Sequence, residues 1–220
     1  MFDAAPSTTL LPSRGSSVAA TGPTSHDRLA ASCGPLVTIM PGAEIYAEGD
    51  KSGALYQVAF GVIRIYRLMA DGRRQICAFY MPGDIFGFES GTQRHFFADA
   101  VDTVGLRTLR PNTLSDLSHE LLKLALQSLS RAHDHLLTVG RNDAAGRVAA
   151  FLLDMAERQG GPLGRINLPM SRTDIADYLG LTIETVSRVL SRMKDAGIIK
   201  MASARQLELL NPTALEDMTA

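Results

Sequence analysis

The stretch SRTDIADYLGLTIETVSRVLSRMKDAG, from Ser171 to Gly197, decides the fold of the C-terminal part of this 220-residue chain. Ser171 suits the N-cap of a first helix, with Asp174 as its partner in a capping box. Gly180 supplies a tight turn, and Thr182 caps a second helix. The apolar residues expected to face inward recur at helical spacing: Ile175, Ala176, Leu179, Val186, Val189, Leu190 and Met193. The pattern predicts a helix-turn-helix whose second helix stops at Gly197.

The second of these helices presents polar residues outward near its start. With the apolar residues turned inward, Glu184, Ser187 and Arg188 fall on the outer side, followed by Arg192. Arginine can donate two hydrogen bonds to guanine, and glutamate can accept one from cytosine, in the major groove of DNA. The pattern therefore favours a helix that reads bases. An ordinary helical hairpin with a solvated polar face is the alternative.

The residues after this hairpin strengthen the DNA-binding interpretation. Residues 198–200 and 207–210 are short strand-like runs around a polar turn at 201–206. This order predicts a winged helix-turn-helix, in which Lys200 and Arg205 are available to DNA phosphates.

Residues 171–197 resemble the helix-turn-helix of the cyclic-AMP receptor/FNR superfamily of bacterial transcription regulators. Members of the FNR and FixK types carry Glu-x-x-Ser-Arg on the recognition helix, which here is Glu184, Ser187 and Arg188. Cyclic-AMP-receptor-like members typically have Gly at the Ser position, so the resemblance points to the FNR/FixK side. It extends over nearly the whole chain after residue 34 and looks most like rhizobial FixK-type regulators. It implies a non-enzymatic regulator, mainly an activator, of low-oxygen and nitrogen-fixation genes.

The resemblance also implies a DNA site and the residues that contact it. The expected site is a palindrome with TTG…CAA arms, commonly TTGAT-N4-ATCAA. Arg188 would contact guanine, Glu184 would accept a hydrogen bond from the opposite cytosine, and Ser187 would help discriminate the outer positions. Ile183 would touch a thymine methyl. The residues expected at phosphates are Ser171, Arg172, Thr173, Thr182, Arg192 and Lys200. For Ser171 and Thr182, plain helix capping is the structural alternative.

The N-terminal half is broken into short strands by turn signals at 41–42, 71–72 and 82–84. Between these signals, β-rich runs occupy 54–59, 62–68 and 75–80, and such spacing indicates a small sandwich or barrel. The resemblance sharpens this expectation to the double-stranded β-helix, or jelly roll, of cyclic-nucleotide-binding-type sensor domains. The predicted fold class is therefore α+β, with this sensor domain followed by a long helix and the winged helix-turn-helix.

Residues 112–140 carry a long apolar stripe that predicts a single helix. The stripe consists of Leu114, Leu117, Leu121, Leu124, Leu126, Leu129, Leu136, Leu137 and Val139. Such a helix either packs only on its own barrel or pairs in part with a twin helix, and the resemblance favours a homodimer. A hinge is expected at 141–143, a further helix at 144–159 and a loop at 160–164. The expected division is a flexible arm at 1–28, the β-barrel domain at 29–111, the dimerisation helix at 112–140 and the DNA-binding domain at 141–220.

The ligand-binding residues of cyclic-AMP-binding members have poor counterparts here. By resemblance, those members have a Gly-Glu pair followed about ten residues later by an Arg-Ser or Arg-Thr pair. The glutamate would bind the ribose hydroxyl, and the arginine would bind the cyclic phosphate. Here Glu89 lies one residue further along the chain than the glutamate of the family's Gly-Glu pair. Arg94 is followed by His95 rather than by a serine or threonine. Four phenylalanines are expected to fill the pocket or the core instead: Phe86, Phe88, Phe96 and Phe97. This argues against a small-molecule effector. A haem- or ligand-gated sensor that binds DNA only when loaded is the alternative function.

The sequence gives little support for a metal site, a cofactor or an enzymatic activity. Cys33 and Cys77 have no metal-type spacing, and two cysteines cannot supply the four-cysteine iron–sulfur site that a resemblance to FNR itself would imply. His133 and His135 do not share a helix face, so no metal site or cofactor is expected. The chain lacks GxSxG, P-loop and HExxH motifs.

The composition and net charge indicate where the protein is located and what it binds. No apolar run reaches the roughly 20 residues of a membrane span, and the Ser-, Thr-, Ala- and Pro-rich start does not have the pattern of a secretory signal. The expectation is a cytoplasmic protein. Its net charge of −1 argues against indiscriminate nucleic-acid binding. The expected partners are double-stranded DNA, a second copy of the chain and RNA polymerase.

Overall fold

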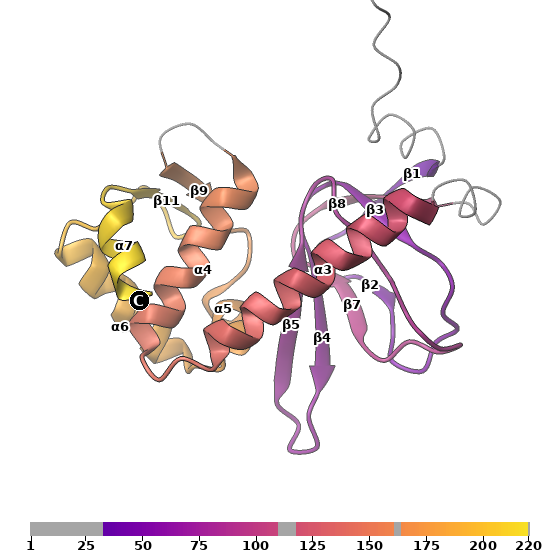
Figure 1. The fold of residues 1–220 in the computed structure, drawn as a ribbon, viewed down its shortest axis with the longest axis horizontal. Coiled ribbons are helices and arrows are strands. Elements are labelled where there is room, and N and C mark those ends of the chain that lie inside the picture. Colours follow the sequence, from indigo (N-terminus) through magenta and orange to yellow (C-terminus); the bar gives the residue numbers. More distant parts are fainter. Residues whose placement is uncertain (1–32, 110–117, 161–163, 220) are drawn as a thin grey trace, which may run out of the picture.

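The computed structural model describes residues 33–109, 118–160 and 164–219 (Figure 1). The N-terminal half is a jelly roll of short antiparallel strands, as the sequence predicted. Its strands are β1 (Cys33–Ile39), β2 (Glu44–Tyr46), β3 (Tyr56–Phe60), β4 (Ile63–Leu68), β5 (Arg74–Tyr80), β6 (Ile85–Phe86), β7 (Phe97–Ala100) and β8 (Val104–Leu109). They form two four-stranded sheets, ordered β1-β8-β3-β6 and β2-β7-β4-β5.

The core of the jelly roll lies between the two sheets, because alternate residues of each strand face inward. It contains Tyr46, Val58, Ile63, Ile65, Phe86, Ala98, Ala100, Val104 and Leu106. Of the four predicted pocket or core phenylalanines, Phe86 is fully buried and Phe96 packs against this core. Phe88 packs against a second core cluster that contains Ile85 and Leu109, and both Phe88 and Phe96 line a cavity, so the prediction holds for them as well. Phe97 stacks on Tyr66 with ring centroids 5.2 Å apart.

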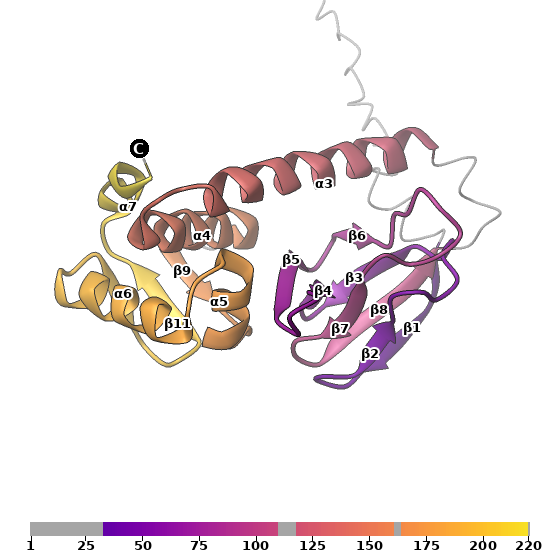
Figure 2. The same cartoon turned by 90° about the horizontal axis from the view of Figure 1, so that it is seen from below.

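A long helix, α3 (Ser118–Val139), leads from the jelly roll to the C-terminal half. Figure 2 shows it running along one side of the β-strands and reaching the point where α4 begins. The predicted start of this helix at residue 112, like the expected arm at 1–28, lies outside the described residues. Leu121 is buried against the jelly roll, whereas five leucines of α3 are more than half exposed: Leu122, Leu126, Leu129, Leu136 and Leu137.

The C-terminal half begins with α4 (Ala144–Gln159), whose bounds match the predicted helix. The Asp143 carboxylate caps its start by accepting a hydrogen bond from the Gly146 amide, and Gly160 ends it in the left-handed conformation. The hinge is therefore only the short connection between Val139 and Ala144. Among the helices of the described ranges, none is long and apolar enough to cross a membrane.

The remaining elements form the winged helix-turn-helix. They are β9 (Arg165–Asn167), α5 (Arg172–Leu179), α6 (Ile183–Asp195), β10 (Ile199–Met201), β11 (Gln206–Leu209) and α7 (Pro212–Met218). The two wing strands were predicted one residue away from their observed positions. The sequence missed β9, which pairs with β11 and makes the wing a three-stranded sheet, and it missed α7. One core joins the halves of this region and includes Val148, Phe151, Leu152, Ile175, Val186 and Leu190.

Candidate nucleic-acid interface

The first helix of the hairpin starts at the predicted capping box. The Ser171 hydroxyl accepts a hydrogen bond from the Asp174 amide at 3.0 Å, and the Asp174 carboxylate accepts one from the Ser171 amide at 2.9 Å. Gly180 ends this helix with φ +63°, where a side chain would be strained. These two local signals fix the angle at which the chain enters and leaves α5.

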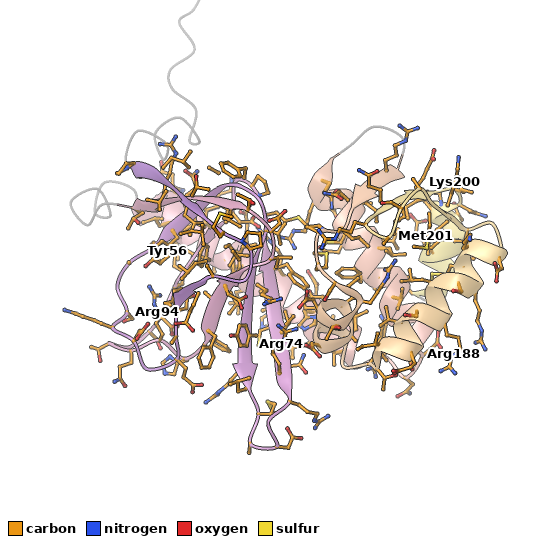
Figure 3. The ribbon with its side chains drawn as sticks, turned by 180° about the vertical axis from the view of Figure 1, so that it is seen from behind. Tyr56, Arg74, Arg94, Arg188, Lys200 and Met201 are labelled. Atoms are coloured by element: carbon orange, nitrogen blue, oxygen red, sulfur yellow. The ribbon has the colours of Figure 1, made fainter. Side chains whose placement is uncertain are left out.

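The second helix, α6, is amphipathic in the predicted sense. Its buried residues are Val186, Val189, Leu190 and Met193. The four residues predicted to face outward, Glu184, Ser187, Arg188 and Arg192, are exposed, and so is Ile183. Thr182 caps the helix by accepting a hydrogen bond from the Thr185 amide at 3.2 Å. Figure 3 shows Arg188 extending away from the body of the molecule. Its guanidinium contacts only the nearby Thr185 hydroxyl, at 3.5 Å, within the described residues.

Two of the base-reading candidates, Glu184 and Ile183, are suited to different parts of a base pair. Hydrogen bonds from the backbone amide of Glu184 itself and from the Thr182 side chain hold the pKa of the Glu184 carboxyl below its usual value. Glu184 is therefore an ionised acceptor at neutral pH, as a contact to cytosine requires. Ile183 is 42% exposed at the first position of the helix, where an apolar side chain can meet a thymine methyl.

The predicted phosphate residues lie at the helix starts, in the last turn of α6 (Arg192) and on the wing. Ser171, Thr173, Thr182, Arg192 and Lys200 are exposed. Arg172 is half-buried, and burial lowers the pKa of its guanidinium. It donates to the Ala204 carbonyl at 3.3 Å, which brings the start of α5 against the tip of the wing. In Figure 3, Lys200 and Arg188 extend from separate places on the same side of the molecule.

The residues of α3, α4 and β5 that pack on α5 were missed in the sequence analysis. Arg147 of α4 donates to the carbonyls of Arg141, at 2.8 Å, and Leu179, at 3.1 Å, and so ties the hinge to the end of α5. Tyr178 packs between Phe79 of β5, Phe151 of α4 and His135 of α3. Apart from the bond between Arg147 and Arg141, no local pattern could have revealed these contacts, because they join elements distant in sequence.

The stack of His135 on Tyr178 predicts that the folded protein loses stability as the pH is lowered. The two rings lie 3.9 Å apart and 14° from parallel, and the His135 Nδ1 atom is buried without a hydrogen-bond partner among the described residues. Burial lowers the pKa of His135 to about 4, from an ordinary value of 6.5. Between those two pH values the unfolded chain binds more protons than the folded one, so stability falls as pH falls from 6.5 towards 4.

We expect this single group to remove about 2 kcal/mol of unfolding free energy between pH 7.5 and pH 5. Urea unfolding of the wild type and of His135→Phe at both pH values measures the effect, since the phenylalanine keeps the stack and cannot titrate. The variant should lose less stability than the wild type on acidification. Equal losses in the two proteins would contradict the assignment.

Protein groups occupy most of the predicted remnant of a ligand site, although the buried Nε atom of Arg94 has no hydrogen-bond partner among the described residues. Arg94 is 2% exposed, and its guanidinium donates to the carbonyls of Gly87 and Ala54, both at 2.6 Å. The same guanidinium lies 4.2 Å from the centroid of the Tyr46 ring. The Glu89 carboxylate accepts a hydrogen bond from the His95 amide at 3.2 Å and contacts the His95 ring nitrogen Nδ1 at 2.7 Å. Both charged groups of this region thus have partners within the protein.

A cavity of about 730 Å³ lies between the jelly roll, α3 and the C-terminal half. Its lining includes Tyr46, Tyr80 and Phe96 from the jelly roll and Ser128 and Arg131 from α3. Cys77 also lines it, and burial raises the pKa of this thiol, which makes it a poor nucleophile at neutral pH. In the described part of the chain, no cluster of three or more histidine, cysteine or acidic residues is arranged to hold a metal ion.

Comparison with known proteins agrees with this geometry. Residues 36–119 match the cyclic nucleotide-binding domain family, and residues 146–218 match the Crp-like helix-turn-helix domain family. The nitrogen fixation regulation protein FixK of Rhizobium meliloti (strain 1021) is 50% identical over 184 residues, which are 83% of this chain and 86% of that protein. The chain belongs to the CRP/FNR family of transcription regulators, on its FixK side.

Two further relatives place this FixK-type regulator within the family. The fumarate and nitrate reduction regulatory protein of Vibrio cholerae is 32% identical over 192 residues, covering 82% of this chain and 76% of that one. The structure of FixK2 from Bradyrhizobium japonicum superposes with a TM-score of 0.79 at 40% identity, over 84% of this chain and 97% of the other. The protein is thus a helix-turn-helix DNA-binding regulator and not an enzyme.

Proposed function

We propose that this regulator binds as a homodimer to a TTGAT-N4-ATCAA-like palindrome. The observation that carries the proposal is the outer face of α6. Glu184, Ser187 and Arg188 are exposed there within two turns, above a fully apolar underside. A helix of this kind can enter the major groove while its buried face stays packed on the rest of its domain.

The proposed base contacts follow from the chemistry of that face. Arg188 donates to guanine, Glu184 accepts from the opposite cytosine, Ser187 helps select the outer bases, and Ile183 covers a thymine methyl. Ser171, Arg172, Thr173, Thr182, Arg192 and Lys200 form the proposed phosphate contacts. The backbone amides at the starts of α5 and α6 favour anions as well.

The exposed leucines of α3 support the homodimer. Leu122, Leu126, Leu129 and Leu136 follow a heptad-like spacing, and Leu137 flanks them. An apolar stripe of this length on a surface helix is typical of an interface. Two recognition helices related by a two-fold axis would then read half-sites about 34 Å apart.

The internal partners of Arg94 and Glu89 support DNA binding without a small-molecule effector. A cyclic phosphate would have to compete with two carbonyls and an aromatic face for the Arg94 guanidinium. By the names of its relatives, we propose that the regulator acts mainly as an activator of low-oxygen and nitrogen-fixation genes. It would do so in the cytoplasm by recruiting RNA polymerase.

Fluorescence anisotropy of the purified, ligand-free protein tests this function. We expect nanomolar affinity for a TTGAT-N4-ATCAA duplex at about 150 mM salt, and binding to a scrambled duplex at least about 1,000-fold weaker. Weak and unselective binding would contradict the proposal. If added cyclic AMP or haem then restored selectivity, the cavity beside α3 would become the effector site of a ligand-gated sensor.

A further inference from the structure

A partly buried cluster of charges joins the helix-turn-helix to the jelly roll. We call it the interdomain ion-pair cluster, and it consists of Arg64 of β4, Arg74 of β5, Asp99 of β7, and Asp174 and Asp177 of α5. Arg64 holds Asp99 through two hydrogen bonds, of 2.6 and 2.9 Å, and reaches Asp174 at 2.8 Å. Arg74 contacts Asp174 at 2.7 Å and Asp177 at 2.8 Å. In Figure 3, Arg74 lies where the two halves meet.

The centre of the cluster is shielded from water, which separates it from ordinary surface ion pairs, whereas the Arg74 and Asp177 side chains at its edge are 23% and 25% exposed. The Asp174 side chain is 5% exposed and that of Arg64 17%. The Asp174 carboxylate accepts from both arginines and from the amide and hydroxyl of Ser171. Burial alone would raise the pKa of Asp174, but the hydrogen bonds from Ser171 and the charges of Arg64 and Arg74 outweigh it and lower that pKa. Removing an arginine would leave buried negative charge with fewer partners, a costly arrangement.

Further contacts hold α5 in the same orientation. The Gln75 side-chain amide donates to the Asp177 carbonyl at 2.8 Å, and Phe79 packs on Tyr178 with ring centroids 5.1 Å apart. Figure 2 shows α5 on the side of the C-terminal half that faces β5. Because α6 packs on α5, whatever orients α5 also orients the recognition helix.

The covalent link between the halves cannot fix their orientation alone. The chain passes from α3 to α4 through Gly140 to Asp143, and a connection of this kind leaves rotation about several backbone bonds. In the proposed homodimer, α3 defines the two-fold axis. The angle between α3 and α6 therefore determines the distance between the two recognition helices.

We infer that Arg64 and Arg74 are positioning residues for DNA binding. Through Asp174 and Asp177 they dock the helix-turn-helix on the jelly roll and so select operators by the length of the spacer between half-sites. This inference rests on the proposed homodimeric function. It assigns spacer selectivity to residues far from the DNA and leaves base selectivity to α6.

Spacer selectivity is the measurement that tests the inference. The wild type and Arg64→Gln/Arg74→Gln are titrated against a single half-site and against palindromes whose spacers are shorter or longer than N4 by one and two base pairs. We expect the double variant to bind the N4 palindrome about 10-fold more weakly and to lose most of its preference for N4, with half-site affinity unchanged. The matched control is Arg73→Gln, since Arg73 is 82% exposed at its side chain and pairs only locally with Asp71.

Rescue separates positioning from a general loss of structure. Arg74→Asp combined with Asp177→Arg keeps the net charge of the cluster and places the new arginine beside both Asp174 and position 74, so the N4 preference should be recovered. Arg74→Asp alone sets a third carboxylate beside Asp174 and Asp177 and should not recover it. A spacer profile identical to that of the wild type would overturn the inference. If the double glutamine variant fails to fold, shown by loss of half-site binding and of its circular dichroism, the charge-exchange pair decides the matter. A wild type that does not prefer the palindrome to a scrambled duplex would instead refute the proposed function.

Discussion

Arg188→Ala is expected to weaken binding to the palindrome by about 1–3 kcal/mol per half-site. A homodimer makes this interaction twice, so the total is about 2–6 kcal/mol, or roughly 30-fold to more than 10⁴-fold in affinity. The physical reason is the removal of the two parallel hydrogen bonds that Arg188 is proposed to donate to guanine. In the free protein the Arg188 guanidinium is exposed, with one long hydrogen bond to Thr185, so little is sacrificed when it turns to a base.

Anisotropy at constant salt measures this weakening, and a base substitution identifies its source. The variant should no longer distinguish a palindrome in which the guanine of each arm is replaced. Lys200→Ala is the control, because removing a phosphate interaction should weaken binding to the palindrome and to the scrambled duplex about equally and reduce the salt dependence. Undiminished affinity of Arg188→Ala would refute its assignment as a base-reading residue.

Leu126→Asp is expected to separate the proposed homodimer into monomers. Leu126 is 57% exposed in the single chain, and a symmetric seam would bury it twice. Burial of one leucine contributes about 1.5–3 kcal/mol. Removing both copies raises the dimer dissociation constant by at least about 100-fold. The two introduced carboxylates would repel each other across the seam and add to the effect.

Analytical ultracentrifugation at micromolar protein measures the change in assembly. Gln127→Asp provides a matched control, since it puts the same charge on the next residue of α3, which is exposed outside the leucine stripe. The control should remain dimeric, and the Leu126 variant should bind a palindrome no better than a single half-site. A dimeric Leu126→Asp protein would show that another surface forms the interface.

Local signals explain why so much of the DNA-binding half could be predicted. Asp143 and Gly160 mark the ends of α4, and Ser171 with Asp174 marks the start of α5, because each mark is a hydrogen bond between residues close in sequence. The apolar underside of α6 is equally local. By contrast, β9 has a single buried side chain, Ile166, and three residues are too few for periodicity to reveal a strand.

The contacts between the jelly roll and the C-terminal half could not be predicted from the sequence, for a different reason. Arg64 and Arg74 stand at strand positions that look exposed in the sequence, and a role as a helix cap fully accounts for Asp174. Nothing in their spacing reveals that they meet across about 100 residues of chain, because that meeting depends on how two finished domains pack. Arg94 is similar: its carbonyl partners could not be predicted from the residues beside it.

The shared role of Asp174 has a consequence for work with shortened proteins. A fragment starting at the hinge would keep the Ser171 cap but would be without both arginines and the aromatic cover of Phe79 and His135. Its α5 would then expose a carboxylate and a tyrosine ring that the intact chain keeps from water. Such a fragment would report the base preference of α6 faithfully, yet it would misstate both the solubility and the operator geometry of the whole regulator.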